Sequence, residues 1–221
     1  MGASGGFPID LVLFGMIAAF LVLRLRSILG RRQGFERQAA EPRVAMRPQV
    51  AEGPVIDAVA ERVPARPLPD PASPVGQALT RMQAVDRNFQ ALRFLEGAET
   101  AFKLIVTAFA AGNRDGLRPL LSDDTYKAFE SAITAREAAG ETHRTEVRAI
   151  HTATIEAADL RGSIADVTVH FVTDQVTLTT GPDGAVLQGT DAVTEIVDLW
   201  TFERNLAVQD PTWRLVAARS A

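Results

Sequence analysis

The chain has 221 residues, 47% of them hydrophobic, with a formal net charge of −4 and no cysteine. The mild negative charge excludes nucleic-acid binding that depends on the bulk electrostatic attraction of a basic chain. The absence of cysteine excludes a disulfide framework, so nothing in the composition implies an oxidising compartment.

The first feature along the chain is an apolar segment that ends in arginines. Residues 11–23 contain no charged side chain, and Phe7 and Leu25 extend the apolar stretch on both sides. As a helix, residues 7–25 would be roughly 28 Å long, which matches the ~30 Å hydrocarbon core of a bilayer. The arginines that follow are Arg24, Arg26, Arg31 and Arg32. The pattern predicts a transmembrane anchor over residues 1–30 with a basic juxtamembrane end.

Two other interpretations of this segment are a cleaved signal peptide and a soluble core helix. A signal peptide carries its positive charges before the apolar run, whereas here they follow it. A core helix would need apolar partners on all sides, because the run has no polar face. We favour a single anchor. The positive-inside rule then places the N-terminus outside and the rest of the chain in the cytoplasm. The excess of arginine over lysine is typical of GC-rich bacteria, so we expect the bacterial inner membrane.

The segment 31–74 is rich in proline and separates the anchor from the remaining chain. It holds eight of the 12 prolines, and prolines at this density block regular helix. We expect a disordered, partly extended tether. A short helix at residues 55–63 would be marginal in water. The remaining residues, 75–221, are enough for one domain.

Helical periodicity begins after the tether. Residues 79–92 carry apolar side chains at intervals of three and four, which predicts one amphipathic helix. The pattern repeats over residues 95–109, and Gly112 supplies the left-handed residue that commonly follows a helix. A third helix is predicted to begin after Ser122, a good N-cap that two aspartates follow, and to end at Gly140.

After Gly140 the pattern changes to alternating, β-branched residues, which predicts strands. The expected strands are residues 145–157, 164–180, 193–202 and 213–217. In the second strand the apolar residues change parity, so we expect a bulge or a change of face at residues 171–173. Helices followed by an antiparallel meander predict an α+β domain, with the helices packed on one face of a curved sheet.

Several short stretches of this domain form a recognisable set. They are Phe94-Leu-Glu-Gly-Ala98, Leu120-Leu-Ser122, Trp200-Thr-Phe-Glu-Arg204 and Asp210-Pro-Thr-Trp-Arg-Leu215. Together they resemble the Tim44-like domain family over roughly residues 89–217, and the last two stretches are the most specific. The anchor that ends in basic residues is similar to that of bacterial members.

The resemblance implies a cone-like α+β domain similar to the nuclear-transport-factor-two superfamily. The family takes its name from a peripheral subunit of the mitochondrial inner-membrane protein translocase, which tethers the import motor to the channel and binds anionic lipid. Family members lack an accepted catalytic site. On this resemblance we expect a non-enzymatic, membrane-tethered adaptor linked to protein translocation or membrane-protein biogenesis.

The residues themselves contain no nucleophile motif and no glycine-rich phosphate loop, and the histidines lack metal-ligand spacing. We therefore expect neither a metal nor a cofactor. The candidate catalytic set is His170 with Asp166 and Asp198, because superfamily members sometimes use a histidine–aspartate pair as acid and base. Alternatively, these groups line a solvated sheet face opposite Val167 and Val169. The catalytic interpretation defines the alternative function, a pocket enzyme or small-ligand receptor.

Three aromatic residues are candidates for the lining of a pocket. They are Trp200, Phe202 and Trp213. Such rings form the floor of many ligand sites. They also fill the cores of small domains, and this second interpretation places them between the sheet and the helices.

Two sets of arginines are candidates for membrane binding. The first is Arg24, Arg26, Arg31 and Arg32. These contribute about 1 kcal/mol each near an anionic surface, or serve only to set topology. The second is Arg81, Arg87 and Arg93, which flank the apolar stripe of the helix predicted over 79–92. That helix could lie on the membrane, bind a partner or dock on its own domain. The expected partners are the lipid bilayer, anionic lipids and an unidentified protein, with no nucleic acid.

Overall fold

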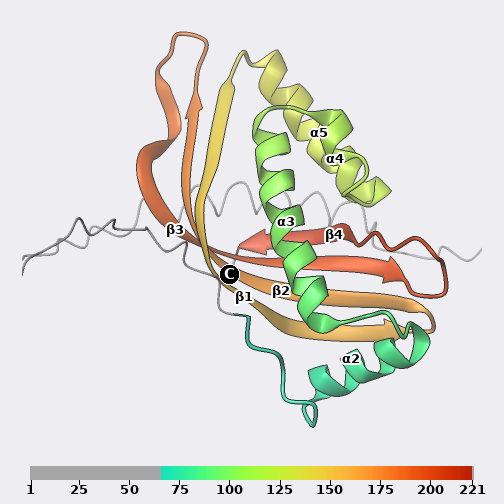
Figure 1. The fold of residues 1–221 in the computed structure, drawn as a ribbon. Coiled ribbons are helices and arrows are strands. Elements are labelled where there is room, and N and C mark those ends of the chain that lie inside the picture. Colours follow the sequence, from blue (N-terminus) through green and yellow to red (C-terminus); the bar gives the residue numbers. More distant parts are fainter. Residues whose placement is uncertain (1–65, 221) are drawn as a thin grey trace, which may run out of the picture.

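The computed structural model describes residues 66–220, and Figure 1 shows how they are arranged. The predicted anchor, its four arginines and most of the tether, including the helix expected at residues 55–63, lie outside the described residues. Within residues 66–220, no helix is both long and apolar enough to cross a bilayer.

Helix α2 (Pro74–Val85) is shorter than the sequence pattern predicts. Ser73 caps its first turn, and the helix ends before Asp86, so the single helix predicted over 79–92 is wrong. The Asp86 backbone is extended, and its carboxylate accepts the N–H of the second residue after it at 2.9 Å. This local hydrogen bond competes with the helix. The sequence pattern of apolar residues runs on past the end of α2 because Phe89, in the turn, is buried as well.

The remaining helices are α3 (Ala91–Ala110), α4 (Arg114–Leu117) and α5 (Asp123–Ala138). The predicted signals at their ends are confirmed. Gly112, with φ of +67°, follows α3, and Gly140, with φ of +68°, follows α5. The Ser122 hydroxyl accepts a backbone N–H in the first turn of α5. The four-residue α4 was not predicted, because one turn of helix leaves no periodic pattern.

Four strands form one antiparallel sheet in the order β1-β2-β3-β4. They are β1 (Thr142–Arg161), β2 (Ile164–Thr180), β3 (Val186–Asn205) and β4 (Arg214–Ser220). Figure 1 shows that the sheet is strongly curved and that α3 lies across its concave side. The predicted α+β class and the meander are therefore confirmed for the described part of the chain.

The change of face expected in β2 at residues 171–173 does not occur. Alternate residues from Ala165 to Gln175 are buried without interruption. The register shifts in the β1–β2 pairing arise instead from extra residues in β1. Because the same face of β2 stays buried throughout, the buried residues along it are apolar up to Phe171 and then become polar at Thr173 and Gln175. The Gln175 amide donates to the Thr173 hydroxyl at 2.8 Å, so a hydrogen bond offsets the burial of these polar groups.

The apolar core lies between α3 and the concave side of the sheet. Phe102 of α3 is fully buried and contacts Phe171 of β2, with ring centroids 4.7 Å apart, and Trp200 of β3, at 4.6 Å. Aromatic pairs at such distances contribute beyond the area that they bury. This packing fixes α3 on the sheet and so positions the side of the helix that carries the site described below.

Candidate functional site

A groove of about 670 Å³ lies beside α3. Its walls come from the turn between α2 and α3, from one side of α3, from Leu120 before α5, and from the end of β3 with the loop that leads to β4. A volume of this size is typical of sites that receive a ligand or a part of a partner molecule.

The floor of the groove is aromatic. Trp213 is half-buried and contacts Phe94 at a centroid distance of 4.7 Å and Phe89 at 5.9 Å. Phe202 of β3 contacts Phe94 from the other side, at 6.1 Å. Three of these rings belong to the core, and Trp213 places an amphipathic ring at the edge. The floor therefore offers apolar area to an occupant.

The α3 wall of the groove is shallow at Gly97. This glycine is exposed in the middle of a 20-residue helix, and a Cβ added to it would meet no atom within 4 Å. Glycine inside a helix costs about 1 kcal/mol relative to alanine, and the described chain shows no packing that requires it. One turn on, the wall continues with the small residue Ala101, and it ends at Leu104, which is 53% exposed.

A largely buried ion pair holds Arg204, which lines one end of the groove. The Arg204 Nη1 lies 3.1 Å from the Asp86 Oδ2, and both side chains are only 12% exposed. The Arg204 Nε also donates to the Asp210 carbonyl at 2.9 Å. The pair joins the α2–α3 turn, at the residue where α2 ends, to the end of β3.

An exposed cation, Arg93, stands on the rim at this end. Among the residues that the structure describes it forms no ion pair within 4.0 Å. The N-terminus of α3 beside it has no acidic residue in its first turn, and Gln90 makes no side-chain capping bond. Helix N-termini carry a partial positive charge. The acidic residue that lines the groove is Glu96, and its carboxylate lies 3.9 Å from Arg66. The end of the groove around Arg93 is thus electropositive.

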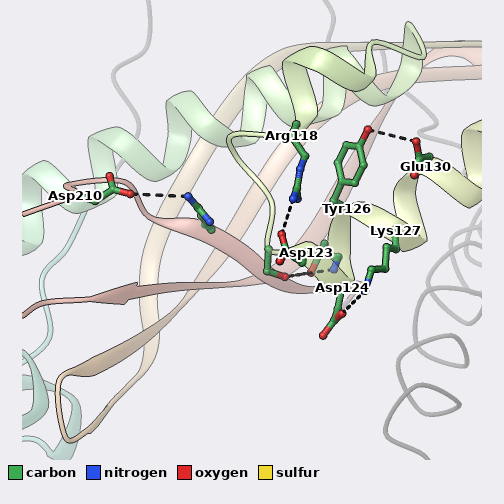
Figure 2. A network of polar contacts seen from close by, with 10 residues as sticks. Arg118, Asp123, Asp124, Tyr126, Lys127, Glu130 and Asp210 are labelled. Atoms are coloured by element: carbon green, nitrogen blue, oxygen red, sulfur yellow. Dashed lines mark hydrogen bonds and ion pairs between the residues drawn. The ribbon is translucent and has the colours of Figure 1, made fainter. Parts of the chain in front are cut away.

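A second polar network holds the wall that Leu120 provides (Figure 2). Arg118 pairs with Asp123 at 2.7 Å and lies over the Tyr126 ring at 4.9 Å. The hydrogen bond from Arg118 lowers the pKa of the Asp123 carboxyl. The Leu120 carbonyl accepts the N–H of Leu215 in β4 at 2.8 Å. These contacts connect the start of α5 to the sheet and keep the groove wall in place.

Comparison with known protein families identifies one match. The model of the Tim44-like domain matches residues 75–220, well over half of the chain. The chain belongs to the Tim44-like domain family. The resemblance noted in the sequence is therefore confirmed, and both the groove and the aromatic floor lie inside the matched Tim44-like domain.

One solved structure similar to the Tim44-like domain is that of the intermembrane space region of the chloroplast protein ARC6. The two chains share 11% sequence identity, and the alignment covers 58% of this chain and 94% of that one, with a TM-score of 0.43. Comparison with curated protein sequences finds no significant match.

The three aromatic residues predicted either to line a pocket or to fill the core do not all have the same role. Phe202 and Trp213 line the groove of the Tim44-like domain. Trp200 does not, because it is buried against Phe102 and Phe171. Its indole N–H has no hydrogen-bond partner within the described residues. Trp200 is therefore a core residue, while Trp213 borders both the core and the groove.

The structure does not bring the candidate catalytic residues together. Asp198 is opposite Phe171 in the β2–β3 pairing and is buried on the concave side, whereas His170 and Asp166 belong to the other face of the sheet. The sheet of the Tim44-like domain thus separates His170 from Asp198, and Asp166, on the same face as His170, is engaged by Arg161.

The three arginines of the predicted helix lie on three different elements. Arg81 is on α2, Arg87 is in the turn and Arg93 is on α3, and all three are exposed. They do not form one stripe beside one apolar face. Their role in binding anionic lipid stays a prediction, and of the three only Arg93 lines the groove.

Sequence reasoning did not select Gly97 or Arg204 as site residues. A signal existed for Gly97, because a glycine inside a helical pattern often has a packing or functional reason. A signal existed for Arg204 too. It shares the parity of Phe202 on a strand whose alternate residues are buried, and a charged residue at such a position requires a partner. Asp86, the partner, lies far away in the sequence.

Proposed function

We propose that this chain is a non-enzymatic, membrane-tethered adaptor whose groove holds a segment of a partner protein. Membership of the Tim44-like family supports a scaffolding role associated with protein translocation in general. The observation that carries the proposal is the groove itself. It has an aromatic floor and an exposed, shallow helical wall, which are features of a binding surface.

The groove supports binding better than catalysis. The charged residues along it are Arg93, Glu96 and Arg204, and Arg204 is already engaged by Asp86. No histidine lines it, and His170 lies on the other face of the sheet from Asp198. General acid–base catalysis needs two groups within reach of one substrate atom. The alternative of a pocket enzyme or ligand receptor therefore gains no support from this groove.

The membrane part of the proposal rests on the sequence. An anchor over residues 1–30 would hold the domain at the cytoplasmic surface of the bacterial inner membrane, with Arg24, Arg26, Arg31 and Arg32 next to anionic lipid. A reporter active only in the periplasm, fused after Ala221, should stay silent, and a cytoplasmic reporter there should be active. The reverse result would overturn this orientation.

Site-specific photo-crosslinking tests the adaptor role. The full chain would carry a photoreactive residue in its native membrane at position 104 or, as a control of similar exposure, at position 187 in the β2–β3 hairpin. Leu104 and Leu187 are 53% and 56% exposed. We expect a discrete protein adduct from position 104 only, which disappears when Gly97→Leu narrows the groove. Equal adducts from both positions, or none from position 104, would contradict the proposal.

A further inference from the structure

We propose that the groove receives an apolar α-helix of the partner protein, with a carboxylate of that helix seated against Arg93. This inference rests on the adaptor function proposed above and specifies the chemistry of the bound segment. Shape, apolar contact and charge each contribute a separate argument.

The shape argument comes from the exposed wall of α3. The wall extends from Arg93 through Gly97 and Ala101 to Leu104. Eleven steps of 1.5 Å make this edge about 16 Å long, or three helical turns. Packed helices approach to 8–10 Å between axes, and small residues at the contact allow the closest approach. Because Gly97 leaves open space that the described chain does not use, a rod-shaped backbone is the occupant that the wall fits.

The aromatic floor supplies the apolar contact. Phe94, Phe89 and Trp213 meet at centroid distances of 4.7–6.4 Å around the deep part of the groove. A helix that lies along α3 presents large side chains every three or four residues toward this floor. Binding energy concentrates where such a side chain enters an aromatic pocket, so Trp213 is the expected anchor point.

The charge argument concerns the end of the groove. Arg93 is exposed, and no carboxylate of the described chain lies within ion-pair distance of it. The adjoining N-terminus of α3 adds positive potential, because no acidic residue occupies its first turn. The guanidinium of Arg204 also lines the groove, and its ion pair with Asp86, at 3.1 Å, holds it in place. A carboxylate on the partner helix would pair with Arg93 by charge-assisted hydrogen bonds.

The test uses the full chain in nanodiscs of zwitterionic lipid, with empty nanodiscs as the blank. The probes are two fluorescent helical peptides of leucine and alanine that differ only in one glutamate or one lysine near an end. Anisotropy should show that the glutamate peptide binds more tightly, by about tenfold. Arg93→Glu should reverse that order. Arg87→Glu, a matched change outside the groove, should leave it unchanged.

Gly97→Leu tests the shape argument. It should weaken binding of the glutamate peptide by at least about tenfold, whereas Thr107→Leu, on an exposed part of α3 outside the groove, should have no effect. Circular dichroism would check folding, and Gly97→Ala gives a milder second variant that should weaken binding less. Binding that is insensitive to Gly97→Leu would overturn the proposal.

The competing occupant is a single acyl chain with a carboxylate, for which oleate is the probe. If oleate binds in a Gly97-sensitive way and neither peptide does, the helix proposal is wrong. Failure of the peptides together with a persistent crosslink at position 104 would reject the helix but leave the adaptor function intact. Absence of the position-104 crosslink in the chain that retains Gly97 would reject the adaptor function itself.

Discussion

Arg66 and Glu99 form a two-pronged ion pair that connects the beginning of the described chain to the middle of α3. The Nε–Oε1 distance is 2.5 Å and the Nη2–Oε2 distance is 2.8 Å. The Glu99 side chain is only 8% exposed, and that of Arg66 is 22% exposed. The hydrogen bond to Glu99 raises the pKa of Arg66, while burial opposes this shift. Residues 66–73, predicted as tether, thus contribute to the folded domain.

Removing Arg66 should destabilise the domain. In a fragment of residues 66–221, we expect Arg66→Ala to lower the free energy of unfolding by about 2 to 4 kcal/mol, because it leaves a buried carboxylate unpaired. Adding Glu99→Gln should restore part of this loss. Denaturant titration measures both effects, with the exposed Arg81→Ala as the control. An effect of Arg66→Ala no larger than that of the control would contradict the structural role of the pair.

The two tryptophans should differ in their contributions to stability. Trp200→Ala empties a fully enclosed site and should cost about 3 to 5 kcal/mol. Trp213 is half-buried, so Trp213→Ala should cost about 1 to 2 kcal/mol, less than a completely buried ring would. Thermal unfolding monitored by circular dichroism separates the two. If Trp213→Ala were the more damaging variant, the ring would belong to the core and not to the groove.

Two glycines should respond oppositely to alanine. Gly97→Ala should raise the free energy of unfolding by about 0.5 to 1 kcal/mol, because helix propensity improves and the added methyl meets no atom. Gly112→Ala should lower it by about 1 to 2 kcal/mol, because φ there is +67°. Equilibrium unfolding in urea measures both. A destabilising Gly97→Ala would show that the open space at Gly97 is needed within the domain.

Glu203 should reduce stability at neutral pH. Burial, and then the neighbouring Asp166 charge, raise the pKa of Glu203 in the folded state. Because the folded state holds this proton more tightly, its stability falls as pH rises from the ordinary carboxyl pKa of about 4.3 through the raised value. Glu203→Gln should therefore raise the unfolding temperature at pH 7 but not at pH 4. A wild-type chain that is the more stable at pH 7 would contradict this assignment.

The three arginines Arg81, Arg87 and Arg93 should act on the membrane without supporting the fold. Replacing all three by glutamine should reduce binding of fragment 66–221 to anionic vesicles, and salt should weaken the binding that the unaltered fragment shows. The unfolding temperature should not change, because all three are exposed. Vesicle co-sedimentation and thermal unfolding provide the two readouts. Absence of vesicle binding by the unaltered fragment would reject the lipid role.

Much of the local structure could be predicted from the sequence alone. Caps such as Ser122 and positive-φ glycines such as Gly112 act within a few residues of themselves. The alternation from residue 164 onward indicated β2, because side chains of a strand point to opposite faces in turn. These signals, together with the order of helices and strands, were sufficient for the α+β class, whereas the resemblance to the family came from short stretches such as Asp210-Pro-Thr-Trp-Arg-Leu215.

Only the tertiary structure decided which distant side chains contact one another and which face of each strand is buried. Asp86, at which α2 ends, pairs with Arg204, which is distant in sequence. Burial of Thr173 and Gln175 follows from sheet packing, although the change in parity of the apolar residues predicts a bulge or a change of face there. The groove exists because α3 is held on the sheet by Phe102, beside the end of β3. Each of these features depends on long-range packing, which periodicity does not encode, whereas caps and alternation depend only on neighbours along the chain.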